Sequence, residues 1–371
     1  MKWLKGMFVR SGAVACLALV AGCAMERPPG SGGPALSPDE ARRVIDESIP
    51  RGVPDREGWI NDLYAGFTVQ DLPPTRENVC AVVAVIEQES NFQVDPVIPG
   101  LGAIAWREID ARAAHAGVPR LILHGALDLR SPNGQTYSTR IDAARTEKDL
   151  SDIYEDFIGS VPLGRRLFAD LNPIRTRGPM QVNVAFANQY VEVRPYPYPV
   201  KASISDEVFT RRGSLYFGIA HLLAYQPPYA DYLFRFADFN AGQYASRNAA
   251  FQNAVSTASG IILASDGALL PHEGSAGSPG ETELALRALA PRLNLDEHEI
   301  HDALEKGKSR EFEHTRLYER VFALAEHVAK HPLPRAIVPV IKLEGPKISR
   351  RLTTSWYAHR VDGRFEQCLR K

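Results

Sequence analysis

Apolar residues recur along most of this chain with the spacing of helices that bury one face. The clearest case follows Thr75, where Val79, Val82, Val83 and Ile86 occupy positions i, i+3, i+4 and i+7. Thr75 is a favourable N-cap residue, because its hydroxyl can accept a hydrogen bond from a backbone N–H of the first helical turn. The pattern therefore predicts a helix that begins after Thr75 and packs its apolar stripe against a core.

Comparable patterns predict helices over most of the remaining chain. The first is opened by Ser37-Pro38, a pair that favours a helix start. The predicted helices cover residues 38–48, 103–116, 141–158, two segments of 213–242 separated by Pro227-Pro228, and residues 282–291, 296–306 and 311–330. Residues 337–343 have strand-like character, and 274–281 read as a surface loop. We expect a mostly α fold.

The N-terminus has the features of a secretory signal. Residues 1–22 combine three basic residues with an apolar run too short for a membrane span. The run ends in Val-Ala-Gly-Cys, which resembles a bacterial lipobox with Cys23 as the lipidated residue. An ordinary signal with an incidental cysteine is the alternative. Residues 23–38 then form a flexible tether rich in Pro and Gly.

The residue after Cys23 is Ala24, and not the Asp that resembles an inner-membrane retention signal. We therefore expect the protein at the periplasmic face of the outer membrane, anchored by its N-terminal lipid. Removal of residues 1–22 leaves 40 basic against 44 acidic residues, a net charge of about −4. This balance argues against nucleic acid as a partner.

Two cysteines remain once Cys16 is assigned to the signal and Cys23 to the anchor. These are Cys80 and Cys368, and an oxidising periplasm would allow them to form a disulfide. Cys80 lies on an apolar helix face, where a buried free thiol is an equally natural occupant. The sequence leaves both states open.

Three short strings carry the candidate chemistry. They are IEQESNF at residues 86–92, RGPMQVN at 177–183 and DFNAGQ at 238–243. In this order they resemble the signature of the lytic transglycosylases, lysozyme-like enzymes of the glycoside hydrolase family 23 type that cut peptidoglycan strands. The resemblance covers roughly residues 75–96 and 175–255, and it implies a goose-type lysozyme core. The remaining chain resembles lipoproteins of Gram-negative bacteria at most.

The resemblance also implies a mechanism. The sequence alone leaves Glu87 and Glu89 as candidates, about 160° apart around their helix, and the motif selects Glu89. A carboxylic acid in apolar surroundings can protonate the leaving oxygen of a glycosidic bond. Glu89 would act first as acid and then as base, while the C6 hydroxyl of the substrate attacks C1. The product would be a 1,6-anhydromuramic acid end, formed without a cofactor or a metal.

The other motif residues would bind the glycan. The family pattern implies this role for Ser90, Met180, Gln181, Phe239 and Asn240. Asn240 shares a helix face with apolar residues, so its amide needs a hydrogen-bond partner.

Two motif positions depart from the family pattern. Pro179 replaces a Leu and removes one backbone N–H. Phe239 replaces a Tyr, so its hydroxyl is missing unless another tyrosine supplies it. The candidates for that replacement are Tyr216, Tyr232 and Tyr244.

The spacing of the motifs predicts the domain organisation. Glu89 and Gln181 are 92 residues apart, which implies an insertion at about residues 97–174 in a lysozyme-like domain of residues 39–273. We expect the insertion to form a lid or wall of the substrate groove; a helical decoration away from the groove is the alternative. Residues 274–371 would form a helical extension packed on the core.

Two other functions compete with the leading hypothesis. A hydrolytic muramidase would need a second carboxylate, for which Asp95 and Asp238 are candidates. A wall-binding lipoprotein would keep the groove without turnover. The string HEIH at residues 298–301 lacks the spacing of a zinc-protease helix and is interpreted as a solvated, charged helix.

Overall fold

A computed structural model describes residues 36–164, 166, 172–271, 279–343 and 350–371. The predicted signal peptide, Cys23 and most of the tether lie outside these residues, as does most of the loop expected at 274–281. The described chain is mostly helical, as the sequence predicted, and its strands form two short two-stranded ladders. None of the described helices combines the length and apolar character that a membrane crossing requires.

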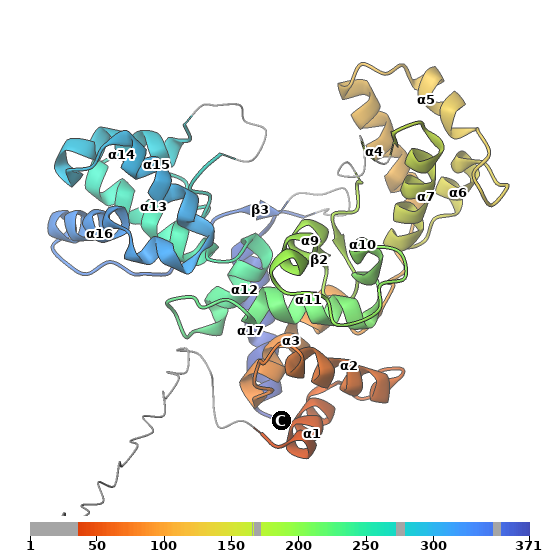
Figure 1. Ribbon diagram of the computed structural model, residues 1–371, viewed down its shortest axis with the longest axis horizontal. Coiled ribbons are helices and arrows are strands. Elements are labelled where there is room, and N and C mark those ends of the chain that lie inside the picture. The colour runs from red at the N-terminus through yellow and green to blue at the C-terminus, as the bar shows by residue number, and fades with distance from the viewer. Residues whose placement is uncertain (1–35, 165, 167–171, 272–278, 344–349) are drawn as a thin grey trace, which may run out of the picture.

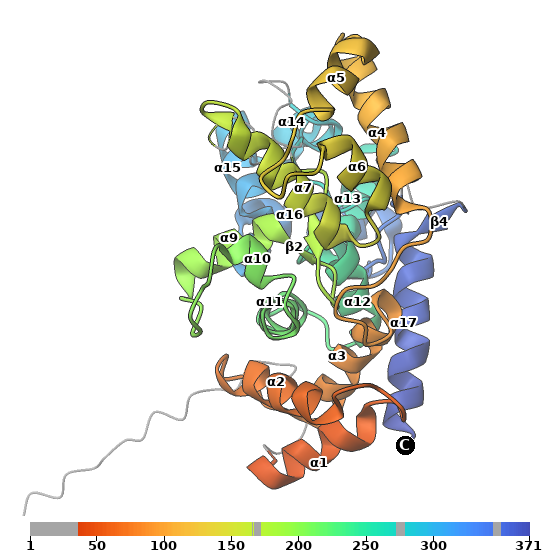
Figure 2. The ribbon, with the colours of Figure 1, turned by 90° about the vertical axis from the view of Figure 1, so that its right-hand side faces the viewer.

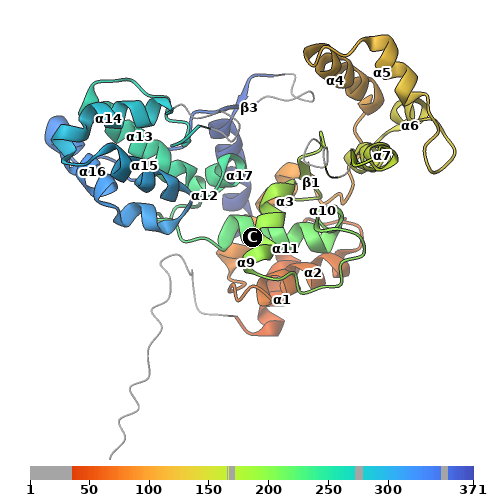
Figure 3. The same ribbon diagram turned by 45° about the horizontal axis from the view of Figure 1, so that its top comes forward.

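The helices form three bundles, each with its own hydrophobic core (Figure 1). The central bundle consists of α1 (Pro38–Ser48), α2 (Arg56–Thr68), α3 (Arg76–Glu89), α9 (Val184–Val193), α10 (Ile204–Glu207), α11 (Arg211–Leu223), α12 (Tyr232–Ala241) and α17 (Thr354–Leu369). The insertion bundle consists of α4 (Leu101–His115), α5 (Arg120–Leu127), α6 (Tyr137–Ala143) and α7 (Glu147–Ser160). The distal bundle consists of α13 (Ala245–Ser259), α14 (Glu281–Leu293), α15 (Glu297–Glu305) and α16 (Arg316–Ala329), with the short 3₁₀ helices η2 (Lys306–Lys308) and η3 (Arg310–His314). Figures 1 and 3 show the insertion and distal bundles on opposite sides of the central one.

Helix α3 is the innermost element of the central bundle. Thr75 caps it, since its side chain accepts a hydrogen bond from the N–H of Asn78. All residues from Asn78 to Ile86 are buried, including the predicted apolar stripe. A helix that is buried on every side needs neighbours all round it, and these are mainly α17, α1 and α11. The last residues of α3 are therefore partly exposed, at the end of a helix whose preceding residues are fully buried.

Helix α17 runs antiparallel along α3, although 288 residues separate their cysteines (Figure 2). Cys368, near the end of α17, forms a disulfide with Cys80 in the first half of α3. On its other side α17 packs against α12, where the rings of Tyr232 and Phe365 stack with centroids 4.7 Å apart. The C-terminal helix is thus part of the central core.

The cores divide the chain differently from the boundary expected at residue 273. Helix α13 precedes that boundary, but its apolar face packs with α14 and α16 in the distal bundle. Helix α17 follows it and packs in the central bundle. The reason is that α17 buries an apolar face of its own against α3 and α12. The sequence predicted only that residues 274–371 form one extension.

A short hairpin carries the second motif string. Strand β1 (Thr176–Arg177) pairs antiparallel with β2 (Val182–Asn183). Gly178 opens the intervening turn with a φ of 72°, and a Cβ there would overlap the carbonyl oxygen of Val208. Both the backbone conformation and the close approach therefore require glycine.

Several predicted element bounds agree with the structure and others do not; the helix predicted at 311–330, for example, begins only at Arg316. Helices α1 and α3 begin where their caps predicted. The segment predicted as one helix at 141–158 is divided, because the backbone is extended at Ala144 and Thr146 caps α7. Within 337–343, only β3 (Lys342–Leu343) is a strand, and it pairs with β4 (Leu352–Thr353).

The disulfide gives the first testable prediction. Replacing Cys80 and Cys368 with serine lowers the free energy of unfolding by about 2–5 kcal/mol, because the unfolded chain loses a long-range constraint. Urea unfolding of the full chain under non-reducing conditions measures the difference. Dithiothreitol should destabilise the wild type and leave the double variant unchanged. Equal unfolding midpoints for the two proteins without reductant would show that α17 is held by packing alone.

Candidate functional site

The end of α3 presents two acidic side chains in different surroundings. Glu87 lies 3.6 Å from Arg364 of α17, measured from its carboxylate to the guanidinium. Glu89 is the last residue of the helix and is half-buried. The structure thus places Glu87 beside an arginine of α17, and Glu89 beside a tyrosine hydroxyl of the same helix.

That hydroxyl belongs to Tyr357 in the first turn of α17. Burial raises the pKa of Tyr357 well above its ordinary value, and the Glu89 carboxylate beside it raises the pKa further. Among the described residues, the hydroxyl makes no hydrogen bond of ordinary length and angle. Tyr357 therefore stays protonated, and its O–H is a donor held next to Glu89.

The same turn of α17 holds Asn240, the asparagine of the third motif. Thr354 donates a hydrogen bond of 2.8 Å from its hydroxyl to the side-chain oxygen of Asn240. Thr354 and Tyr357 are three residues apart and lie on one face of the helix. Tyr357 contacts Glu89 and Thr354 contacts Asn240, so both motif residues lie at the first turn of α17. Thr354 of α17 thus provides a partner for the Asn240 amide.

Sequence reasoning missed both α17 residues. A tyrosine hydroxyl does lie beside Glu89, but it belongs to Tyr357, which was not among the three candidate tyrosines. One of those, Tyr232, instead donates to the side chain of Asn78 at the other end of α3. In the sequence, only the possible disulfide between Cys368 and Cys80 linked the C-terminal residues to the helix that carries Glu89.

Ser90 follows Glu89 and points back into the helix. Its hydroxyl donates to the carbonyl of Ile86 at 3.2 Å, and the side chain is buried. The next two residues, Asn91 and Phe92, both adopt positive φ values of 50° and 62°. A bulky residue rarely adopts this conformation, and the ring of Phe92 is held against Trp59 with centroids 4.9 Å apart. The chain thus turns sharply away directly after Glu89.

The family pattern implied that Met180 lines the substrate groove, but the structure places it in the core. Its side chain has no exposed surface and packs against Gly218 of α11, where a Cβ would overlap the Met180 sulfur. Its backbone N–H donates to the Ser214 hydroxyl at 3.0 Å. Met180 therefore anchors the turn to α11. Pro179 is also buried.

Gln181 lies where the insertion bundle meets the turn. Its amide oxygen accepts from the Thr176 hydroxyl at 2.9 Å, and its amide nitrogen donates to Glu147 at 3.0 Å. Glu147 is the first residue of α7. Asp95, which follows the turn after Glu89, interacts with the neighbouring Thr146. The start of α7 thus connects the first and second motif segments.

Phe239 is buried beside His221 of α11. The rings have centroids 5.1 Å apart, and the Nε2 of His221 donates to the Phe239 carbonyl at 3.2 Å. Burial lowers the pKa of His221 to about 4. Its Nδ1 is buried without a hydrogen-bond partner among the described residues. The imidazole is therefore neutral at physiological pH.

Asp238 is fully buried and serves the backbone. Its carboxylate accepts hydrogen bonds from the hydroxyls of Tyr225 and Tyr229 and from the N–H groups of Tyr244 and Ser246. Burial raises the pKa of Asp238 above its ordinary value, although the bonds from Tyr229, Ser246 and Tyr225 act in the opposite direction. Because four donors occupy a carboxylate without exposed surface, Asp238 joins α12 to α13 and is not available as a catalytic base.

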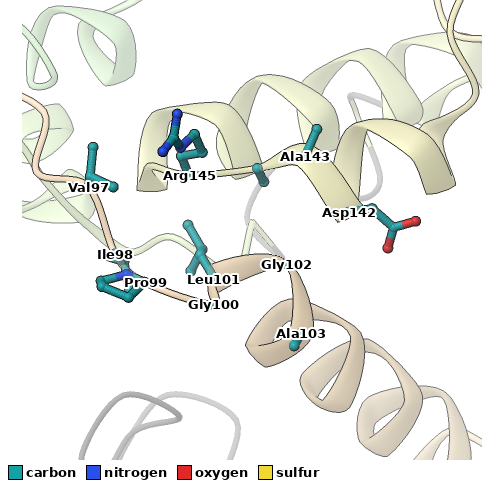
Figure 4. Close-up of a pocket in the computed structure, with 11 residues that line it drawn as sticks. Val97, Ile98, Pro99, Gly100, Leu101, Gly102, Ala103, Asp142, Ala143 and Arg145 are labelled. Carbon is teal, nitrogen blue, oxygen red and sulfur yellow. The ribbon is translucent and has the colours of Figure 1, made fainter.

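A hollow lies inside the insertion segment, between the start of α4 and the residues that follow α6 (Figure 4). Its charged lining residues are Asp142 and Arg145, and Asp142 accepts a hydrogen bond of 2.7 Å from the indole of Trp106. None of the motif residues lines it. Because the Asp142 carboxylate already binds the Trp106 indole, and no amide side chain is among the described residues that line the hollow, it is not the candidate site.

Comparison with known proteins assigns the chain to a family. The chain belongs to a family described as "Protein of unknown function (DUF1615)", whose model matches residues 52–371 and so includes all three motif strings and α17. It is similar to the protein described as "Uncharacterized protein YaiW" of Escherichia coli strain K12. The two are 50% identical over 355 residues, which cover 95% of this chain and 96% of the relative. No solved structure matches the chain. The functional conclusion therefore depends on the site itself.

The environment of His221 predicts a pH dependence of stability. Its pKa is about 4 in the folded protein and about 6.5 when unfolded, so the unfolded chain binds the extra proton between these values. Stability therefore falls as pH is lowered through this window, by about 2 kcal/mol between pH 7 and pH 5. Urea unfolding of the wild type and of His221→Gln at both pH values measures this.

His221→Gln keeps an N–H donor but does not titrate. Between pH 7 and pH 5 it should therefore lose about 2 kcal/mol less stability than the wild type. Equal losses in the two proteins would mean that His221 is charged, or exposed, in the folded state.

Proposed function

We propose that the protein is a lytic transglycosylase that cleaves the MurNAc–GlcNAc bond of peptidoglycan and leaves 1,6-anhydroMurNAc ends. Glu89 is its acid and then its base. The proposal includes export and lipidation at Cys23, which would place the enzyme at the periplasmic face of the outer membrane.

One observation carries the proposal: Glu89 ends a buried helix at the point where α17 supplies a neutral hydroxyl and orients a motif amide. The buried part of α3 is rigid and fixes the position of the Glu89 carboxyl group. A general acid must be held in place in this way. Tyr357 adds a donor without adding a charge. Thr354 orients the Asn240 amide, whose N–H groups would bind the N-acetyl carbonyl of the substrate. These groups suit a reaction in which the substrate provides the nucleophile.

A hydrolytic muramidase is less well supported. It needs a second carboxylate placed to activate water or attack the sugar. Asp238 is occupied by four donors, and Asp95 interacts with Thr146 at the start of α7. A transglycosylase needs only Glu89. The insertion bundle would form a wall of the groove, because α7 contacts Gln181 through Glu147.

Digestion of purified sacculi by the full chain tests the reaction. Mass spectrometry of the released fragments should find 1,6-anhydroMurNAc ends. Glu89→Gln should reduce their formation by at least about a hundredfold, since loss of a general acid costs about 10²–10⁴-fold in rate. Glu87→Gln is the matched control, because it lies on the same helix end and should retain activity.

The outcomes distinguish the three functions. Reducing ends in place of anhydro ends would mean hydrolysis. Sacculus binding without release of fragments, equal in wild type and Glu89→Gln, would mean a wall-binding protein. Equal activity of wild type and Glu89→Gln would overturn the role of Glu89.

The anchor is tested separately. Cys23→Ser should abolish incorporation of radiolabelled palmitate and move the protein from the outer-membrane fraction to the soluble periplasmic fraction. Labelling that persists in the variant, or fractionation of the wild type with the inner membrane, would contradict the proposed location.

A further inference from the structure

An exposed aromatic side chain lies next to the residue that contacts Glu89. Trp356 precedes Tyr357 in α17 and is 39% exposed. Arg360 follows one turn later, and its guanidinium carbon lies 5.6 Å from the centroid of the Trp356 ring. A tryptophan offers a ligand a large apolar face and one N–H donor. Trp356 and Arg360 together form the Trp–Arg platform.

The guanidinium of Arg360 is oriented but not neutralised. Its Nε donates to the side-chain oxygen of Gln88 at 3.1 Å. Among the described residues Arg360 has no carboxylate within ion-pair distance, whereas the neighbouring Arg364 is paired with Glu87. The bond through Nε leaves the two terminal nitrogens of Arg360 for another acceptor. That pair of donors matches the geometry of a carboxylate.

The platform borders the proposed site. Gln88 precedes Glu89 in α3, and Trp356 precedes Tyr357 in α17, so the same helix contact that joins Glu89 to Tyr357 also joins Gln88 to Arg360. A glycan that placed its scissile bond at Glu89 would therefore extend over, or beside, Trp356 and Arg360.

We infer that the Trp–Arg platform binds the part of the glycan that carries a peptide stem. This inference depends on the proposed function. The apolar face of a sugar ring packs on Trp356, and Arg360 binds a free carboxylate of the peptide. Peptide stems are the anionic part of peptidoglycan, and Arg360 carries a charge that no carboxylate of the described chain neutralises. The enzyme therefore prefers strands with stems over strands without them.

Two substrates test this preference: soluble glycan strands with their peptide stems, and the same strands after an amidase has removed the stems. The full chain should cleave the first with the higher kcat/KM. Arg360→Ala should lower kcat/KM about tenfold on strands with stems and leave it unchanged on bare strands. Trp356→Ala should raise KM on both substrates, because it removes the surface for the sugar.

Two further variants separate this role from a structural one. Arg370→Ala removes an exposed arginine at the other end of α17 and should change neither rate. Arg360→Lys keeps the charge but not the paired donors, and should recover only part of the preference. Thermal unfolding of each variant confirms that α17 remains folded.

The results also separate this inference from the proposed function. If the wild type forms anhydro ends but Arg360→Ala keeps the full preference for strands with stems, the inference is wrong and the proposed function stands. The inference is equally wrong if the wild type cleaves both substrates at one rate. If the wild type cleaves neither substrate, both fail together.

Discussion

The antiparallel contact between α3 and α17 is the feature on which the rest of the site depends. Helix α3 can be fully buried only because α17 covers one of its faces, and the disulfide between Cys80 and Cys368 fixes their register. With that register set, the first turn of α17 necessarily meets the last turn of α3. Glu89, Tyr357 and Asn240 are neighbours for this reason. Residues far apart in the sequence thus form one structural unit.

Around this unit the other two bundles have different relations to the site. The insertion bundle contacts the second motif directly, since Glu147 of α7 binds Gln181. The distal bundle is joined to the central one through Asp238, whose carboxylate links the end of α12 to the start of α13. The insertion bundle is therefore attached to the second motif, and the distal bundle to the helix that carries the third.

Much of the fold followed from sequence patterns, and the site followed only in part. Apolar spacing and the caps at Ser37 and Thr75 predicted helices that the structure contains, because those signals are local. The burial of Met180 and the pairing of Asn240 with Thr354 depend on helix packing, which no local pattern encodes. The sequence predicted residues 274–371 as one helical extension, and did not single out α17 as the helix that completes the site.

The most direct test of this account is an experimental structure of the Glu89→Gln variant bound to a peptidoglycan tetrasaccharide. We expect the sugar chain between the substituted side chain at position 89 and Asn240, with an N-acetyl group close to the Asn240 amide and Tyr357 beside the altered residue. A ligand bound elsewhere, such as in the hollow next to Leu101 and Asp142, would contradict the account. So would a structure in which α17 does not contact the end of α3.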